Sequence, residues 1–468
     1  MYISRKELTL IFMSSLPLLV LPARFECTTN ESGTIEAGAV CCRTSLDFGL
    51  FSCIDGPEPR KVLMTFKVPE IHIGIEVLDN IIERIDFQGS YGVLGPDKAT
   101  QDGGNKSLQY SIIIGAVLSY VIYQTMLSNK QTKVAKRITS ASIVLAILFM
   151  TCFYFSSLDI QNAAVRFPFI LSAFLYILRV LEAYFGFVPK GASGSAWMYC
   201  IYFTLPVEIV YDEKTGKPVK STRKDVLHSV WVLLHTYAFN TVFFSFLCHY
   251  DYMPFGATKA GRLEENAAWT GYFDPMHIGN CFFLGLWFQQ VLAWGAAIVE
   301  FALQALIGWK CVPMIDSPLY ATTKPSDFWS KRWNTVRGIY KPARQYYSVI
   351  TSSILAFVAS GLMHEWIVYL GFKYDRTDIE GAYYNPSNIV IGTNFLFFIY
   401  GAVPVVFEKL LGRIGVIERI WESLPRPVKT CLVLMTSLPL AFWFANPYMH
   451  GRLFLDYEGL GITIFKME

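Results

Sequence analysis

One histidine in a long apolar run is the residue whose position most directly suggests chemistry. His364 lies in the stretch TSSILAFVASGLMHEWIVYL. A polar side chain inside such a stretch is costly, so it marks either a functional site or a hydrogen bond to a neighbouring helix. A neutral imidazole can accept the proton of a hydroxyl group. Small residues just before it (Ala359, Ser360 and Gly361) would let another helix or a substrate approach closely.

The sequence lacks the motifs that mark several classes of hydrolase, metalloenzyme and nucleotide-binding protein. Glu365 follows the histidine directly, but a zinc-protease HExxH motif would need a second histidine at position 368, where Val368 stands. No GxSxG elbow and no P-loop occur, which leaves serine hydrolases and nucleotide-driven proteins without support. No cysteine pair has metal-ligand spacing. We therefore expect no metal site and no bound cofactor.

A second run, PSDFWSKRWN at residues 325–334, combines aromatic and cationic side chains within ten positions. An amphipathic helix at the membrane interface would have this composition, with Trp and Phe in lipid and Lys and Arg towards phosphates. That interpretation accounts for Trp329, Trp333, Lys331 and Arg332. It gives no reason for Asn334 at the end of the run.

The two runs together carry a family resemblance. DFWSKRWN followed by SGLMHEW resembles the membrane-bound O-acyltransferase superfamily, and in particular its wax synthase-like branch. The resemblance is strongest over residues 325–370. Ser330-Lys331 stands where plant wax synthases usually have Gly-Arg, and residues 1–107 have no counterpart in the short plant forms, which bears on the substrate more than on the reaction class. By motif position, the resemblance implies His364 and Asn334 as the active-site residues.

The chemistry of these residue types agrees with such a reaction. Joining an acyl thioester to an alcohol needs a more nucleophilic hydroxyl, which a histidine base supplies. Asn334 could orient the acyl group, the histidine or the developing oxyanion, and these roles stay open. Acyl-CoA is then a co-substrate, and basic side chains would bind its phosphates unless they only mark a cytosolic loop. The candidate contacts are Trp329, Lys331, Arg332, Trp333, Arg337, Lys341 and Arg344.

The composition is that of a membrane protein. Hydrophobic residues make up 53% of the 468 positions and charged residues 16%, with a mean hydropathy of +0.36. A spanning helix needs roughly 20 mostly apolar residues. We expect an all-α integral membrane protein, a polytopic bundle of about 8–10 transmembrane helices with an internal reaction chamber. The qualifying windows are Leu108–Met126, Ile138–Ser157, Ala164–Phe187, Val226–Cys248, Ile278–Gly308, Tyr346–Leu370, Ile389–Leu411 and Cys431–Met449, with Ser195–Tyr211 a shorter piece that either crosses or re-enters.

Charge predicts which loops share a side of the membrane. Segments 127–137, 212–225, 309–345 and 412–430 are rich in Lys and Arg and are expected in the cytosol, whereas the acidic loop 250–277 is expected in the lumen. The predicted location is the endoplasmic reticulum membrane.

The chain divides into three parts by composition. Residues 1–22 contain an apolar stretch behind two basic residues, typical of a signal or anchor segment. Residues 23–107 are polar and expected in the lumen, with a short amphipathic helix over 77–87. Residues 108–468 form one membrane domain, the wax synthase-like part of the chain.

Alternatives remain at the level of function and substrate. A polytopic transporter would use His364, Arg179 and Glu182 to line a pathway, but transport gives no reason for DFWSKRWN. Arg179 and Glu182 stand three residues apart in one span and are expected to form a structural ion pair or to line the chamber. His277, at the end of a span, is expected at the interface. The acceptor is expected to be a lipophilic alcohol from the membrane, with diacylglycerol, a sterol or a small metabolite as alternatives.

Overall fold

The long apolar runs form long helices, because a helix satisfies its own backbone hydrogen bonds where no water is present. The computed structural model describes residues 62–68, 89–94, 98–128, 132–157, 163–250, 252–313, 318–329, 337–372, 388–412, 414–451, 453, 457 and 463–467. Six helical segments in this part of the chain are long and apolar enough to cross a membrane: Gln109–Ser128, Arg223–Leu247, Pro275–Ile307, Val349–Gly371, Thr393–Leu411 and Arg426–His450. The all-helical polytopic fold class is thereby confirmed.

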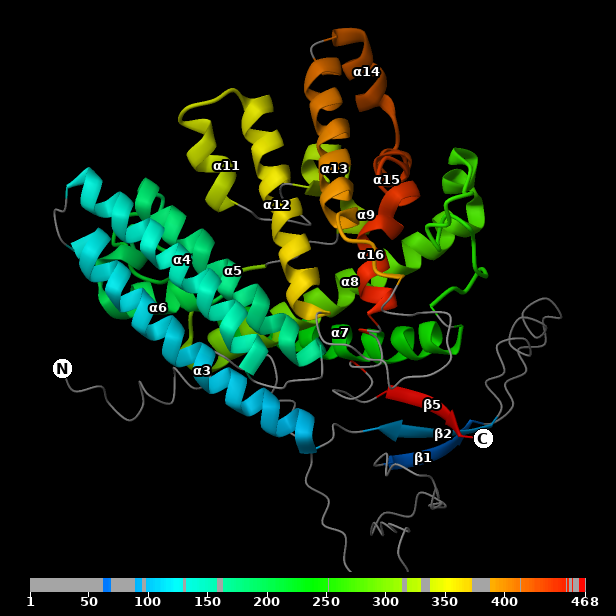
Figure 1. Cartoon of the computed structure of the whole chain (residues 1–468), viewed down its shortest axis with the longest axis horizontal. Coiled ribbons are helices and arrows are strands. Elements are labelled where there is room, and N and C mark those ends of the chain that lie inside the picture. Colours follow the sequence, from blue (N-terminus) through cyan, green and yellow to red (C-terminus); the bar gives the residue numbers. More distant parts are fainter. Residues whose placement is uncertain are drawn as a thin grey trace, which may run out of the picture.

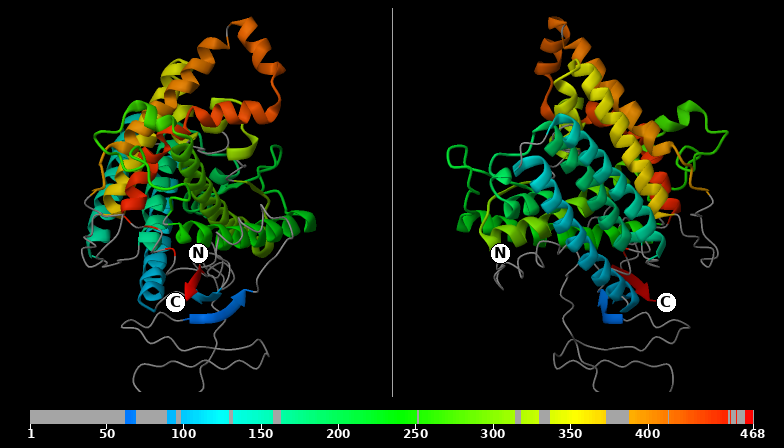
Figure 2. Two further views of the ribbon diagram at one scale, coloured as in Figure 1. Left: turned by 90° about the vertical axis from the view of Figure 1, so that its right-hand side faces the viewer. Right: turned by 60° about the vertical axis from the view of Figure 1, so that its left-hand side comes forward.

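Four helices in the first half of the chain pack into one unit (Figures 1 and 2). They are α3 (Lys98–Ile122), α4 (Lys133–Ser157), α5 (Ala163–Phe185) and α6 (Ala196–Thr204). α5 packs on α3 and α4, and α6 packs on α3. α4 and α5 have 25 and 23 residues, which at about 1.5 Å per residue is also enough to span the membrane.

The short predicted piece Ser195–Tyr211 does not cross. Its helix α6 has nine residues, a length of about 14 Å against a hydrocarbon core of about 30 Å. The chain then returns through β3 (Glu208–Ile209), which pairs with β4 (Cys311–Val312). A further bridge joins Lys220 to Trp309. The basic segments 212–225 and 309–345 therefore lie side by side near residues 220 and 309, and their common cytosolic location stays a prediction.

The second half of the chain surrounds the larger core. α7 (Arg223–His249) packs along α8 (Pro275–Ala302), and α12 (Val349–Gly371) packs along α13 (Thr393–Leu411). α16 (Ala441–His450) contacts both α8 and α13. The core between them is rich in aromatic rings, and α12 also contacts α5, which joins the two halves.

The last predicted span, Cys431–Met449, is broken in the middle. α15 (Arg426–Met435) ends before a 3-10 turn, Leu438–Leu440, and α16 follows. His277 on α8 is completely buried, and its Nε2 donates to the carbonyl of Pro439 in this turn at 2.9 Å. Its Nδ1 then accepts from the Thr258 hydroxyl at 3.2 Å. His277 is the third residue of α8 and so lies at the end of a span, as expected, but its side chain is buried in the protein, where it satisfies the carbonyl that the break exposes.

A small antiparallel sheet joins the two ends of the described chain (Figure 1). β1 (Val62–Val68) pairs with β2 (Gly89–Leu94), which pairs with β5 (Thr463–Met467). These strands were not predicted. The expected signal or anchor at 1–22 and the amphipathic helix at 77–87 lie outside the described residues, and the domain division at residue 107 stays a prediction.

Candidate active site

Helix α12 carries His364 on the face that packs against α13 and α16. The helix begins after Ser348, whose hydroxyl accepts a hydrogen bond from the Thr351 amide at 3.1 Å. Gly361, one turn before the histidine, meets Phe395 of α13: a Cβ at this glycine would lie 2.9 Å from the ring and 3.1 Å from the Cα of Phe395. The close helix approach expected at the small residues is therefore confirmed at Gly361.

Glu365 has a positioning role that the sequence does not reveal. α13 starts after Gly392, which has no side chain to cap the helix. The carboxylate of Glu365 accepts the Phe395 amide hydrogen at 2.9 Å instead, and so satisfies one of the free donors in the first turn of α13. The residue next to His364 thus holds the start of the neighbouring helix.

Two asparagines attach α16 to α13. Nδ2 of Asn394 donates to the carbonyls of Trp443 and Phe444 at 3.3 and 3.2 Å. The Val390 amide, just before α13, donates to Oδ1 of Asn446 at 3.3 Å. Directional bonds of this kind between apolar helices set the register in which their faces meet.

The imidazole of His364 lies among aromatic side chains where α12, α13 and α16 meet. It stacks on Phe398 of α13, with ring centroids 4.5 Å apart and planes 14° apart, and the ring of Phe444 meets it edge-on at 5.3 Å. Nδ1 is 3.4 Å from the hydroxyl oxygen of Tyr448. Within the described part of the chain, no group hydrogen-bonds to Nε2.

The structure also brings Trp329, from the run PSDFWSKRWN, against Phe398, the ring on which His364 stacks. The motif starts in α10 (Pro325–Asp327), where Ser326 donates from its amide and its hydroxyl to Glu408 of α13 at 2.6 and 2.7 Å. Trp329 is buried, 5% exposed, and its ring lies 5.8 Å from that of Phe398. Gly401 makes room for it, because a Cβ there would be 2.8 Å from Cζ2 of the indole.

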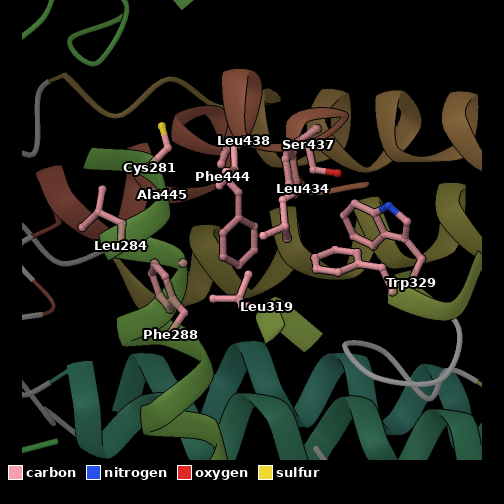
Figure 3. Close-up of a pocket in the computed structure, with 14 residues that line it drawn as sticks. Cys281, Leu284, Phe288, Leu319, Trp329, Leu434, Ser437, Leu438, Phe444 and Ala445 are labelled. Atoms are coloured by element: carbon pink, nitrogen blue, oxygen red, sulfur yellow. The ribbon is translucent and has the colours of Figure 1, made fainter. Parts of the chain in front are cut away.

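A narrow apolar cavity opens beside this cluster, between α8, α13 and the broken α15–α16 segment (Figure 3). Its volume of about 50 Å³ has room for one or two water-sized groups. Trp329 and Phe444 form part of its wall, together with residues that include Phe288, Leu319 and Phe397. The wall therefore suits an acyl or other hydrocarbon chain, which would have to displace side chains to enter.

Four of the predicted site residues, Lys331, Arg332, Trp333 and Asn334, lie outside the described residues. α11 (Arg337–Arg344) follows them. On this helix Lys341 and Arg344 are exposed, and Arg344 donates to the backbone carbonyl of Tyr347 at 2.6 Å. These cations remain accessible to an anionic partner.

Two other cations of the basic 309–345 segment are already engaged in ion pairs. Lys310 pairs with Asp225 at 3.0 Å, and Lys324 pairs with Glu422 of α14 (Gly415–Ser423) at 3.2 Å. Hydrogen bonds from Lys324 and Lys429 lower the pKa of the exposed Glu422 carboxyl. Lys310 and Lys324 therefore have structural partners, whereas the exposed Lys341 ammonium pairs with no carboxylate among the described residues.

Arg179 and Glu182 form the expected structural ion pair. Nη1 of Arg179 lies 2.8 Å from Oε2 of Glu182, and both side chains are about nine-tenths buried. The Tyr202 hydroxyl on α6 donates to the same carboxylate at 2.6 Å, and the guanidinium lies 3.8 Å above the Tyr202 ring. These partners come from α5 and α6, and none of them is from α12, α13 or α16.

Comparison with known proteins supports the reaction class and leaves the substrate open. No protein-family model matches the chain. A segment of it is 40% identical, over 81 aligned residues, to acyl-CoA–sterol O-acyltransferase 1 of Arabidopsis thaliana. That alignment covers 14% of this chain and 23% of the plant protein, so the chain matches about a quarter of that relative's length. The similarity supports the membrane-bound O-acyltransferase superfamily and does not distinguish its wax synthase-like branch.

Proposed function

We propose that this protein transfers a fatty acyl group from acyl-CoA to the hydroxyl of a lipophilic alcohol. Nε2 of His364 accepts the hydroxyl proton while the alcohol oxygen bonds to the thioester carbonyl carbon. The carbon–sulfur bond then breaks, and the proton passes from Nε2 to the departing sulfur. The products are an ester and free coenzyme A, and the reaction needs no metal and no covalent enzyme intermediate.

The main support for this proposal is that a residue from each of the two motifs packs against the same side chain, Phe398. Trp329 and His364 come from separate segments, and both rings contact that one side chain. The histidine is held in apolar surroundings with Nε2 unengaged among the described residues, as a base for a water-sensitive thioester requires. A structural histidine would instead have both ring nitrogens bonded, as His277 has.

Asn334 and the basic side chains complete the proposed site. Asn334 follows Trp329 by five positions and would orient the acyl carbonyl or the oxyanion. Lys331, Arg332, Arg337, Lys341 and Arg344 would bind the phosphates of coenzyme A from the cytosolic side. Asn334→Ala is expected to lower kcat more than it weakens acyl-CoA binding. A pure loss of affinity would assign Asn334 to binding alone.

Two acceptor classes have specific support. A long-chain alcohol fits the wax synthase-like motifs and would enter from the bilayer. A sterol is favoured by the name of the plant relative. Both are lipophilic, and the apolar wall beside Trp329 and Phe444 offers few groups to a polar acceptor. Diacylglycerol and small metabolites are the remaining alternatives.

The test is an acyltransferase assay with an acceptor panel. Purified protein in lipid nanodiscs receives labelled acyl-CoA and equal amounts of a long-chain alcohol, a sterol, diacylglycerol and a short polar alcohol. We expect labelled ester with at least one lipophilic acceptor and a loss of product in His364→Ala. Exclusive use of the polar alcohol would refute the lipophilic acceptor, and no ester with any alcohol would favour a transporter.

A further inference from the structure

The proposed base needs a second residue that controls its tautomer. A neutral imidazole has one N–H, and Nε2 can accept a proton only when that hydrogen is on Nδ1. An acceptor beside Nδ1 favours this tautomer and stabilises the imidazolium that forms during the reaction. The Tyr448 hydroxyl, 3.4 Å from Nδ1, is the hydrogen-bond partner of this ring among the described residues.

Tyr448 is itself held rigidly. It is 4% exposed, and its ring centroid lies 5.1–5.9 Å from those of four phenylalanines: Phe167, Phe288, Phe372 and Phe444. These rings come from α5, α8, the end of α12 and α16. These neighbours leave the ring little freedom. They therefore hold the hydroxyl oxygen in its position 3.4 Å from Nδ1.

We propose that Tyr448 is the positioning residue of His364: its hydroxyl oxygen accepts the Nδ1 hydrogen and directs the lone pair of Nε2 to the alcohol. This inference rests on the proposed acyl transfer. The distance of 3.4 Å is long for a hydrogen bond, and the bond shortens as positive charge develops on the ring. The opposite arrangement, with Tyr448 donating to Nδ1, would put the hydrogen on Nε2 and abolish its role as base.

Removing only the hydroxyl tests the proposal. In Tyr448→Phe we expect kcat to fall about 10–100-fold, which is part of the roughly 10²–10⁴-fold that general-base catalysis contributes, with KM for both substrates within about twofold. The matched control is Tyr176→Phe on α5, which also removes a buried hydroxyl and one hydrogen bond, here to the Ser111 carbonyl at 3.3 Å. We expect kcat of the control to equal that of the parent protein.

A second measurement separates base positioning from general damage. A fatty alcohol fluorinated next to the hydroxyl-bearing carbon is more acidic and needs less help from a base. The kcat ratio of parent to Tyr448→Phe should therefore be smaller with the fluorinated alcohol than with the ordinary one. An equal fall with both alcohols would show a structural effect and overturn the proposal.

The outcomes also distinguish this inference from the function on which it rests. If His364→Ala loses ester synthesis while Tyr448→Phe keeps its kcat, Tyr448 has no positioning role and the acyltransferase proposal stands. If His364→Ala keeps full activity, both proposals fail. Should Tyr448→Phe not fold, site-specific 3,5-difluorotyrosine at position 448 keeps the shape and weakens the acceptor, and an unchanged kcat would then contradict the inference.

Discussion

The α3–α6 unit and the α12–α13–α16 region each bury polar groups among aromatic rings, but they differ in whether the central group is held by an opposite charge. In the first, the Glu182 carboxylate accepts hydrogen bonds from Arg179 and Tyr202, and the Arg179 guanidinium lies over the Tyr202 ring, although its buried Nε has no hydrogen-bond partner among the described residues. In the second, His364 has one ring nitrogen near Tyr448 and the other unengaged among the described residues. A buried charge held by its counter-ion has a structural role, whereas a ring nitrogen that can accept a proton and has no such partner is a candidate for chemistry.

Loss of the histidine should produce the largest change in activity. In His364→Ala, kcat should fall about 10²–10⁴-fold, because the alcohol loses its general base, while the protein stays folded and inserted. The control is His235→Ala, since His235 is exposed on α7 and its ring pairs among the described residues are with Trp231 and Phe239 of the same helix. Near-normal ester synthesis by His364→Ala would remove the functional difference between the two regions.

Breaking the ion pair should affect stability and leave the chemistry intact. Glu182→Ala leaves the Arg179 charge buried without its carboxylate, which we expect to lower the free energy of unfolding by about 3–5 kcal/mol. Thermal unfolding in detergent measures this. Glu264→Ala, which removes the exposed partner of Arg262, should cost less than about 1 kcal/mol. A variant that keeps its stability and loses kcat would place Glu182 in the reaction chamber.

The same substitution at two tyrosines sharpens the comparison. Tyr202→Phe removes a 2.6 Å hydrogen bond to a carboxylate, which should cost about 1.5–3 kcal/mol of stability and leave the kcat of the folded protein unchanged. Tyr448→Phe should show the reverse pattern. Paired thermal unfolding and ester-synthesis assays on both variants decide the matter, and identical behaviour would contradict the distinction between structural and functional clusters.

A smaller effect is expected where the aromatic motif meets α13. Gly401→Ala places a methyl group against the Trp329 indole, which should shift the motif relative to His364 and lower kcat about tenfold. Gly295→Ala on α8 is the matched control, because a Cβ there meets open space. Equal kcat in the two variants would show that the placement of Trp329 does not matter to the reaction.

The helix-forming segments could be read from the sequence because hydropathy is a local property. Windows such as Ala164–Phe187 and Tyr346–Leu370 correspond closely to α5 and α12. Contacts between distant segments were not accessible in this way. The pairing of β5 with β2 has no local signal, because it depends on a partner far away in the chain. The break at Pro439 does have a local signal, since proline cannot continue a helix, but hydropathy windows overlook it.

The candidate site shows the same division. The sequence by itself determined that His364 is a polar group in an apolar span and that it follows an aromatic, basic motif, since residue type and spacing are enough for both. Only the tertiary structure decided that Glu365 caps α13, that Phe398 joins Trp329 to His364, and that Tyr448 faces Nδ1. These contacts join residues 30 to 84 positions apart, and the packing of α12, α13 and α16 brings them together.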